Sequence, residues 1–172
     1  MIWRLSHRAD PEALPLADRH YNRQKPGSPQ FVPPGRCVVL LSGSPACQLW
    51  VTSWPFAEFT KHEWAGAWVC SCYRRESGAA ASEGIRAAVA ATRAIYGDPP
   101  PLGMITFIDR EQVRPTKVRG REVWGWSWLR AGWEVAGESK GGLLCLRVAP
   151  ERMPLPEWPA GAQVPMWRND LR

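Results

Sequence analysis

The chain has 172 residues, of which 45% are hydrophobic and 22% charged, a composition typical of one globular domain with a sizeable core. Its formal net charge of +6 favours contact with a polyanion such as a nucleic acid. Charges interrupt the amino terminus and no apolar run approaches the roughly 18 residues that a membrane span needs. We therefore expect a cytoplasmic protein with neither a signal peptide nor a membrane anchor.

The five cysteines predict neither a disulfide framework nor a zinc site, because their number is odd and no CxxC spacing occurs. Cys70 and Cys72 are two residues apart in a strand-like run, so we expect them to share one face of a strand and to pack there.

The N-terminal half of the chain is predicted to consist of short strands and loops. Residues 25–35 hold four prolines and two glycines, which indicates a loop. The other expected elements are a strand within 1–10, a short helix or turn over 11–22, a hairpin of 37–41 and 48–54, and a strand with alternating faces over 64–73.

From Ser82 the apolar spacing becomes helical, with Ser82 as the expected N-cap and Gly97 as the stop. The remaining expected elements are a strand at 103–109, a helix over about 121–131, two strands within 133–149, and an extended tail from Pro150. This order predicts an α/β (α+β) fold with a single mixed, mostly antiparallel sheet flanked by helices. We expect one domain over residues 1–150 and a proline-rich tail over 151–172.

The segment 73–82 places a loop of small residues before a helix. The free backbone N–H groups and the positive end of the helix dipole favour a phosphate there, and Arg74 and Arg75 add positive charge. The alternative is an ordinary glycine-rich turn.

Residues Arg75–Ala80 resemble the Arg/Gln-x-x-Gly-x-Gly/Ala loop of the GCN5-related N-acetyltransferases (GNAT). Residues 127–149 are similar to that family's last helix and last two strands, so the resemblance covers about 36–149. It implies a GNAT-like fold that binds acetyl-CoA or a related acyl-CoA. The residues implied in binding this cofactor are Arg74, Arg75, Gly78, Ala79, Ala80 and Ser82.

A closer resemblance is to phage Mom-type proteins, which modify adenine in DNA and so protect it from restriction enzymes. It rests on Arg19-His20-Tyr21, the segments 28–36 and 74–76, the strand 103–109 and the segment 139–144. It implies that DNA is the partner and that a small acyl-like group is added to the exocyclic amine of adenine. The chain departs from the usual acyltransferase pattern in one respect, because Trp124, Trp126 and Trp128 stand where a tyrosine often protonates the leaving thiolate.

Four side chains are candidates for catalysis, each with a simpler alternative. Asp109 ends a strand, where it acts as a base or caps the next turn, and Glu76 acts as a base or pairs with an arginine. His20 and Tyr21 lie in a polar segment and are either catalytic or ordinary surface residues. Tyr21 and Asp109 are also possible iron ligands, but too few ligand types accompany them, and we predict no resident metal.

The segment 110–121 holds four arginines and one lysine against a single acid, and is predicted to be a loop that grips phosphates or a solvated loop. Trp124 and Trp126 follow it and either stack on an extruded base or pack in the core. The expected DNA-binding residues are Arg114, Lys117, Arg119, Arg121, Trp124 and Lys140.

These observations favour a phage-type DNA-modifying transferase, which would work in the host cytoplasm if a phage encodes it. The first alternative is a conventional acetyl-CoA-dependent acyltransferase that acts on a small amine or peptide. The second alternative is an inactive binding domain that keeps the fold and the basic surface.

Overall fold

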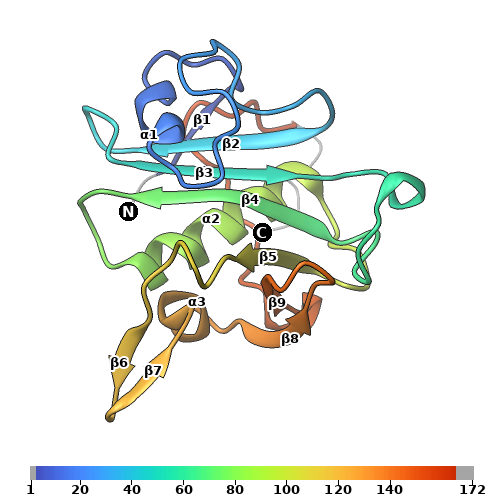
Figure 1. The fold of residues 1–172 in the computed structure, drawn as a ribbon. Helices are drawn as coiled ribbons and strands as arrows, with labels where there is room; N and C mark the ends of the chain where they lie inside the picture. The colour runs from blue at the N-terminus through green and yellow to red at the C-terminus, as the bar shows by residue number, and fades with distance from the viewer. Residues whose placement is uncertain (1–2, 166–172) are drawn as a thin grey trace.

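The computed structural model describes residues 3–165, and it contains one large sheet with helices on both faces (Figure 1). The strands of this sheet lie in the order β1-β2-β3-β4-β5-β9-β8. Every neighbouring pair is antiparallel except β4 and β5, which are parallel. The seven strands are β1 (Arg4–Ser6), β2 (Cys37–Ser42), β3 (Gln48–Ser53), β4 (Trp68–Arg75), β5 (Met104–Ile108), β8 (Glu134–Glu138) and β9 (Leu144–Val148). The expectation of a mixed, mostly antiparallel α+β sheet is thus confirmed.

Both faces of the sheet are apolar, because alternate residues of the central strands point to opposite sides. Val38 and Leu40 of β2 pack in the core beneath helix α2 (Ala81–Tyr96), whereas Val39 and Leu41 pack beneath helix α1 (Leu14–Asp18). Figure 1 shows α2 passing behind β4. Two short 3₁₀ turns, η1 (Ala57–Phe59) and η2 (Pro150–Arg152), complete the connections.

Four buried tryptophans, Trp3, Trp50, Trp68 and Trp133, belong to the core beneath α2. Trp50 and Trp68 are fully buried, and Trp50 Nε1 donates to Thr52 Oγ1 over 2.6 Å. A buried indole N–H usually has such a partner, because leaving it without one costs about 1–3 kcal/mol. The Nε1 of Trp68 has no partner among the described residues. Much of the chain's unusual tryptophan content therefore serves the fold.

The expected helix over 121–131 is wrong in its first part. Residues 116–123 form a separate hairpin of β6 (Thr116–Val118) and β7 (Arg121–Val123), and only the short helix α3 (Trp126–Arg130) follows. Arg119 and Gly120 both have positive φ, at 49° and 77°, as a two-residue hairpin turn requires. Gly125 lies between β7 and α3. This position requires glycine, because a Cβ there would lie 2.5 Å from Leu146 Cδ1.

The expectation for the two strand cysteines is also wrong. A β-bulge opposite Val51 and Thr52 inserts Ser71 into β4, and this extra residue turns Cys70 and Cys72 to opposite faces. Cys70 packs beneath α2, and Cys72 packs on the side of α1.

Ser82 does not cap α2, because the helix already begins at Ala81. Its cap position is Ala80, which offers no side-chain hydrogen bond. After η2, Met153 packs in the core beneath α2, and Ala160 bridges to Arg4 of β1. The last part of the expected tail, 166–172, and the first two residues lie outside the described residues.

Candidate functional site

The two parallel strands at the centre of the sheet part soon after they meet. Their pairing covers only Trp68–Cys70 against Met104–Thr106, after which β4 continues to Arg75 without β5 beside it. Ser71, at the bulge, is exposed although it lies in a central strand. A cavity of about 340 Å³ occupies the opening on the side of α2 and α3, and we call it the donor cavity. Its lining includes Tyr73, Arg75, Thr106, Arg114, Trp126 and Trp128.

The polar segment 20–22 bridges the two parted strands. Tyr21 Oη donates to the carbonyl of Phe107 on β5 over 3.3 Å, and Asn22 Nδ2 donates to the carbonyl of Ser71 on β4 over 2.6 Å. His20 stacks on Tyr21 with ring centroids 4.6 Å apart, and its Nδ1 lies 2.5 Å from Asn22 Oδ1. His20 and Tyr21 both line the donor cavity.

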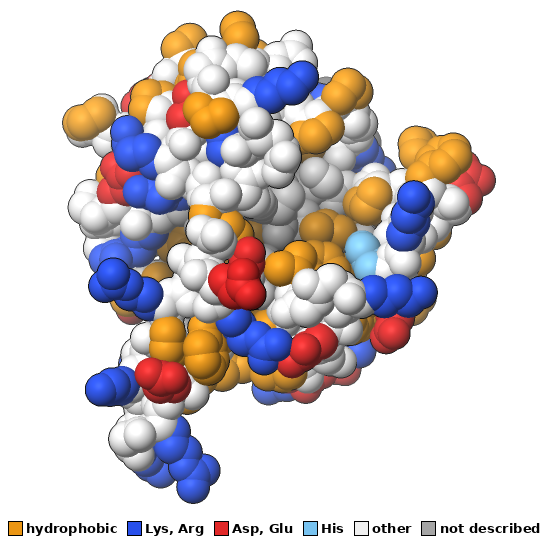
Figure 2. Space-filling model, in the orientation of Figure 1, with side chains coloured by type: hydrophobic (Ala, Val, Ile, Leu, Met, Phe, Trp, Pro, Cys, Tyr) orange, Lys and Arg blue, Asp and Glu red, His pale blue; other side chains and the backbone are white. Residues whose placement is uncertain are grey.

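Tyr21 and Asp109 come together at a second cavity, of about 490 Å³, which we call the Asp109 cavity. Figure 2 shows the hollow in this face of the molecule, between the N-terminal segments above and the last strands below. Burial raises the pKa of Tyr21, and the charge of Asp109 adds to the rise, so this hydroxyl is protonated at neutral pH. Because Tyr21 lines both cavities, it stands at their junction.

Asp109 also caps the turn that follows β5. Its Oδ1 accepts from the Glu111 N–H over 2.9 Å, and its carbonyl accepts from the Val113 N–H. Both roles considered for Asp109 are therefore compatible, since the capping bond uses one carboxylate oxygen and the side chain still borders the cavity.

Burial lowers the pKa of His20, against a hydrogen bond between its Nδ1 and the accepting Oδ1 of Asn22 that raises it, so the ring is neutral at pH 7. A neutral imidazole held by Asn22 orients the neighbouring Tyr21 ring by stacking. Asn22 was not among the residues predicted from the sequence, and its only sequence signal is its position beside His20 and Tyr21.

The loop before α2 is ordered by Arg75. Its Nε donates to the Ala79 carbonyl over 2.8 Å and its Nη2 to the Gly78 carbonyl over 3.0 Å. In a trans peptide the N–H points opposite to the C=O, so the N–H groups of Ala79 and Ala80 point away from Arg75. The first N–H groups of α2 also lack intrahelical partners. Arg75 thus orients a group of backbone donors and does not itself extend toward a ligand.

Two side chains that sequence reasoning missed support this loop. Gln48 is 1% exposed, and its Nε2 donates to the Ser77 carbonyl over 3.1 Å. Tyr73 Oη lies 3.2 Å from Gln48 Oε1 and 3.3 Å from the carbonyl of Ala81, and burial raises the pKa of Tyr73 to about 12. Tyr73 thus lines the donor cavity from β4, whereas the usual acyltransferase tyrosine lies on the helix before the last strands.

Glu76 and Arg74 form an ion-pair cluster with Arg19. Both carboxylate oxygens of Glu76 accept from Arg19, at 2.6 and 2.8 Å, and Arg74 Nε lies 3.0 Å from Oε1. The hydrogen bond from Arg19 lowers the pKa of Glu76. This geometry favours the pairing role of Glu76 over that of a general base.

The basic segment 110–121 is not one loop. Arg114 lines the donor cavity, whereas Lys117, Arg119 and Arg121 lie exposed on the β6–β7 hairpin, which projects away from the sheet in Figure 1. Glu122 is the cross-strand neighbour of Lys117 and offsets part of its charge. Lys140 is exposed in the turn between β8 and β9.

The surroundings of Trp124 favour a packing role over stacking on a base, and the ring is partly buried. Its Nε1 donates to the Val113 carbonyl over 3.0 Å, and its ring packs against the core beneath α2. Trp126 lines the donor cavity, and Trp128 packs against Tyr73 with ring centroids 5.8 Å apart.

Within residues 3–165, no three His, Cys, Asp or Glu side chains gather as a metal site of those ligands would require, and no helix is long and apolar enough to cross a membrane. No protein-family model matches the chain, and neither the curated proteins nor the solved structures contain a significant match to it.

Proposed function

We propose that the protein is a GNAT-like transferase that moves an acyl group from an acyl-CoA to the exocyclic amine of adenine in DNA. The observation that carries the proposal is the opening between β4 and β5, which has a cavity on each side and Tyr21 at the junction. Such an arrangement suits a reaction in which donor and acceptor approach from opposite sides and meet at the opening.

The donor side is supported by the loop at the start of α2. The N–H groups of Ala79 and Ala80, oriented by Arg75, form with the helix N-terminus a site of positive potential suited to a pyrophosphate. The thioester end of the donor then extends along the donor cavity toward Tyr21. Gly78, at φ 87°, permits the sharp turn of this loop.

The chemistry follows from the groups at the junction. Asp109 accepts a proton from the adenine amine as the amine nitrogen attacks the thioester carbonyl. The new bond is an amide C–N bond, and the bond that breaks is the C–S bond of the thioester. The protonated hydroxyl of Tyr21 turns from the Phe107 carbonyl, to which its bond is long at 3.3 Å, and donates to the departing sulfur. The sulfur leaves as a thiolate and takes up a proton to become free CoA thiol.

DNA is favoured as the acceptor by the exposed cations of the β6–β7 hairpin and by Arg114 at the mouth of the donor cavity. Figure 2 shows Lys and Arg side chains on this hairpin. A small amine or peptide would need no such projecting basic arm.

The release of free CoA thiol from acetyl-CoA tests this function with the purified protein. We expect release to require single-stranded DNA that contains adenine, and to be absent with a thymine oligonucleotide of the same length. Release with spermine or a lysine peptide but not with DNA would contradict the DNA assignment and identify a conventional acyltransferase. DNA binding that falls with salt, without any thiol release, would identify a binding module.

A further inference from the structure

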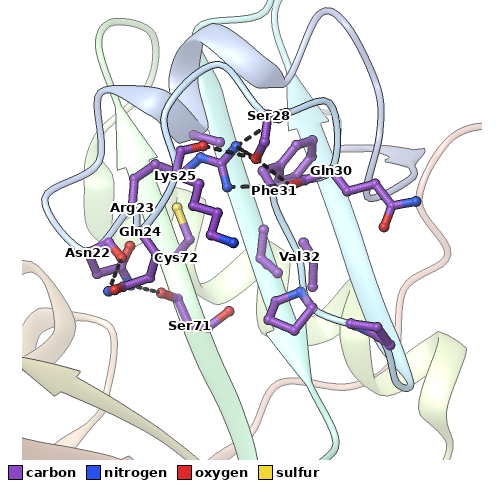
Figure 3. A pocket seen from close by; sticks show the side chains of 14 residues that line it. Asn22, Arg23, Gln24, Lys25, Ser28, Gln30, Phe31, Val32, Ser71 and Cys72 are labelled. Atoms are coloured by element: carbon purple, nitrogen blue, oxygen red, sulfur yellow. Dashed lines mark hydrogen bonds between the residues drawn. The ribbon is translucent and has the colours of Figure 1, made fainter.

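A third cavity, of about 490 Å³, lies on the α1 side of the sheet and was not anticipated from the sequence; we call it the loop cavity (Figure 3). Its floor is formed by Val51 of β3 and by Ser71 and Cys72 of β4, and its walls by the loop 22–34. Ser71 also lines the donor cavity and the Asp109 cavity. The loop cavity therefore borders the opening between the parted strands.

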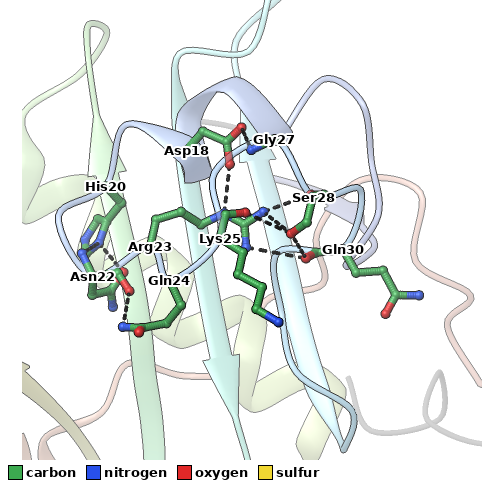
Figure 4. Close-up of polar contacts among 9 residues, drawn as sticks. All are labelled: Asp18, His20, Asn22, Arg23, Gln24, Lys25, Gly27, Ser28 and Gln30. Atoms are coloured by element: carbon green, nitrogen blue, oxygen red, sulfur yellow. Dashed lines mark hydrogen bonds and ion pairs between the residues drawn. The ribbon is translucent and has the colours of Figure 1, made fainter.

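The wall of the loop cavity is held in place by the Arg23–Asp18 ion pair and by Arg8, whose Nη1 donates to the Pro33 carbonyl and whose carbonyl accepts from the Phe31 N–H. Arg23, whose side chain is 9% exposed, places Nε 2.8 Å from Asp18 Oδ1 and donates from Nη2 to the carbonyl and the hydroxyl of Ser28. Asp18 Oδ2 accepts from the N–H of Gly27 over 2.9 Å (Figure 4). These bonds fix a segment that has no helix or strand of its own, so its shape is set before a ligand arrives.

The lining of the loop cavity combines apolar walls with a few polar groups. Phe31, Val32 and two prolines provide the apolar surface, and neither Asp nor Glu is among the lining residues. Figure 3 shows the Lys25 side chain extending over the cavity from the Gln24 side toward Val32. Gln24 Nε2 donates to the Asn22 carbonyl over 3.1 Å, which orients its amide.

This combination fits one chemical class. A side-chain amide forms two hydrogen bonds with the N6 and N7 edge of adenine, and an ammonium group binds a phosphate. The apolar walls suit the faces of a base, and the volume lies within the usual range for small-molecule sites. Gln24 also lines the Asp109 cavity, so its amide and the Asp109 carboxylate border the same space.

We propose that the loop cavity receives an adenine nucleotide extruded from DNA, with Gln24 at the edge of the base and Lys25 at its 5′-phosphate. The inference rests on the proposed function and specifies its acceptor site. It places the acceptor base on the α1 side of the sheet, away from Trp124, whose ring packs against the core beneath α2.

Calorimetric titration with three small probes tests this site: deoxyadenosine 5′-monophosphate, deoxyadenosine and thymidine 5′-monophosphate. We expect the wild type to bind the adenine nucleotide more tightly than either of the others. Lys25→Gln should weaken binding of that nucleotide roughly 10- to 100-fold and leave binding of the nucleoside unchanged, because only the phosphate contact is lost. Gln24→Leu should remove the preference for adenine over thymine.

Lys61→Gln is the matched control, because it removes the same charge at an exposed residue. Lys61 lines none of the three cavities. Equal losses in Lys25→Gln and Lys61→Gln, or no nucleotide binding by the wild type, would overturn the site. If DNA from expressing cells is modified as much by Lys25→Gln and Gln24→Leu as by the wild type, the site is wrong and the proposed function stands. If the wild type modifies no DNA, the proposed function fails, and the titrations still decide whether the cavity binds nucleotides.

Discussion

Asp109→Asn is expected to lower DNA modification by about 10²–10⁴-fold, the usual contribution of a general base. The exocyclic amine of adenine is conjugated with the ring and is a poor nucleophile, so removal of its proton matters for attack. Asparagine has nearly the same shape and keeps the Oδ1 that accepts from the Glu111 N–H. The turn after β5 is therefore preserved, and the melting temperature should stay close to that of the wild type.

Two further variants complete this experiment. Glu111→Gln removes an exposed carboxylate two residues away and should leave activity unchanged. Tyr21→Phe keeps the ring stacked on His20 but loses the hydroxyl that reaches Phe107, and its activity should also fall. The readout is modified nucleoside per amount of folded protein. Wild-type activity in both Asp109→Asn and Tyr21→Phe, or unfolding of both, would show that the two residues are structural.

Gly78→Val is expected to abolish binding of CoA while the protein remains folded. Gly78 has φ 87°, and a Cβ there would lie 2.9 Å from Gln48 Nε2, the atom that holds the Ser77 carbonyl. A β-branched residue at this φ is strained, at a cost of about 1–2 kcal/mol, and the clash forces the loop to move. The N–H groups of Ala79 and Ala80 would then lose their orientation.

Gly142→Val is the control that shows whether backbone strain alone, without damage to the loop 74–82, reduces CoA binding. Gly142 has φ 82° in the turn between β8 and β9, and a Cβ there meets nothing within 4 Å. We expect this control to lose a similar amount of stability and to bind CoA like the wild type, as measured by calorimetry and thermal unfolding. CoA binding that survives in Gly78→Val, or that is lost equally in both variants, would remove the loop from the donor site.

Most of the sheet could be predicted from the sequence, because its strands are short apolar runs between turn residues. The long helix α2 was equally clear from its period. The region 116–130 misled the prediction, because three alternating tryptophans and an Arg-Gly turn carry no decisive helical or strand period. The hairpin turn uses a positive φ at Arg119, and arginine seldom adopts a positive φ, so the turn was hard to predict.

The candidate site was predictable only in part. His20, Tyr21 and Asp109 were found from residue type and position, but the opening that places them together depends on the bulge at Ser71. A bulge adds one residue without a sequence signature, so the alternation of β4 gave the wrong face for Cys72. Gln48 was missed because a polar residue at the start of a strand usually lies in solvent, whereas here it supports a loop from distant sequence.

Mass spectrometry of nucleosides from the DNA of cells that express the protein tests the central claim most directly, because it detects acceptor and product together. We predict a deoxyadenosine heavier by one acyl group, present with the wild type and strongly reduced with Asp109→Asn at equal expression. Unmodified deoxyadenosine in cells that contain abundant folded wild-type protein would contradict the account.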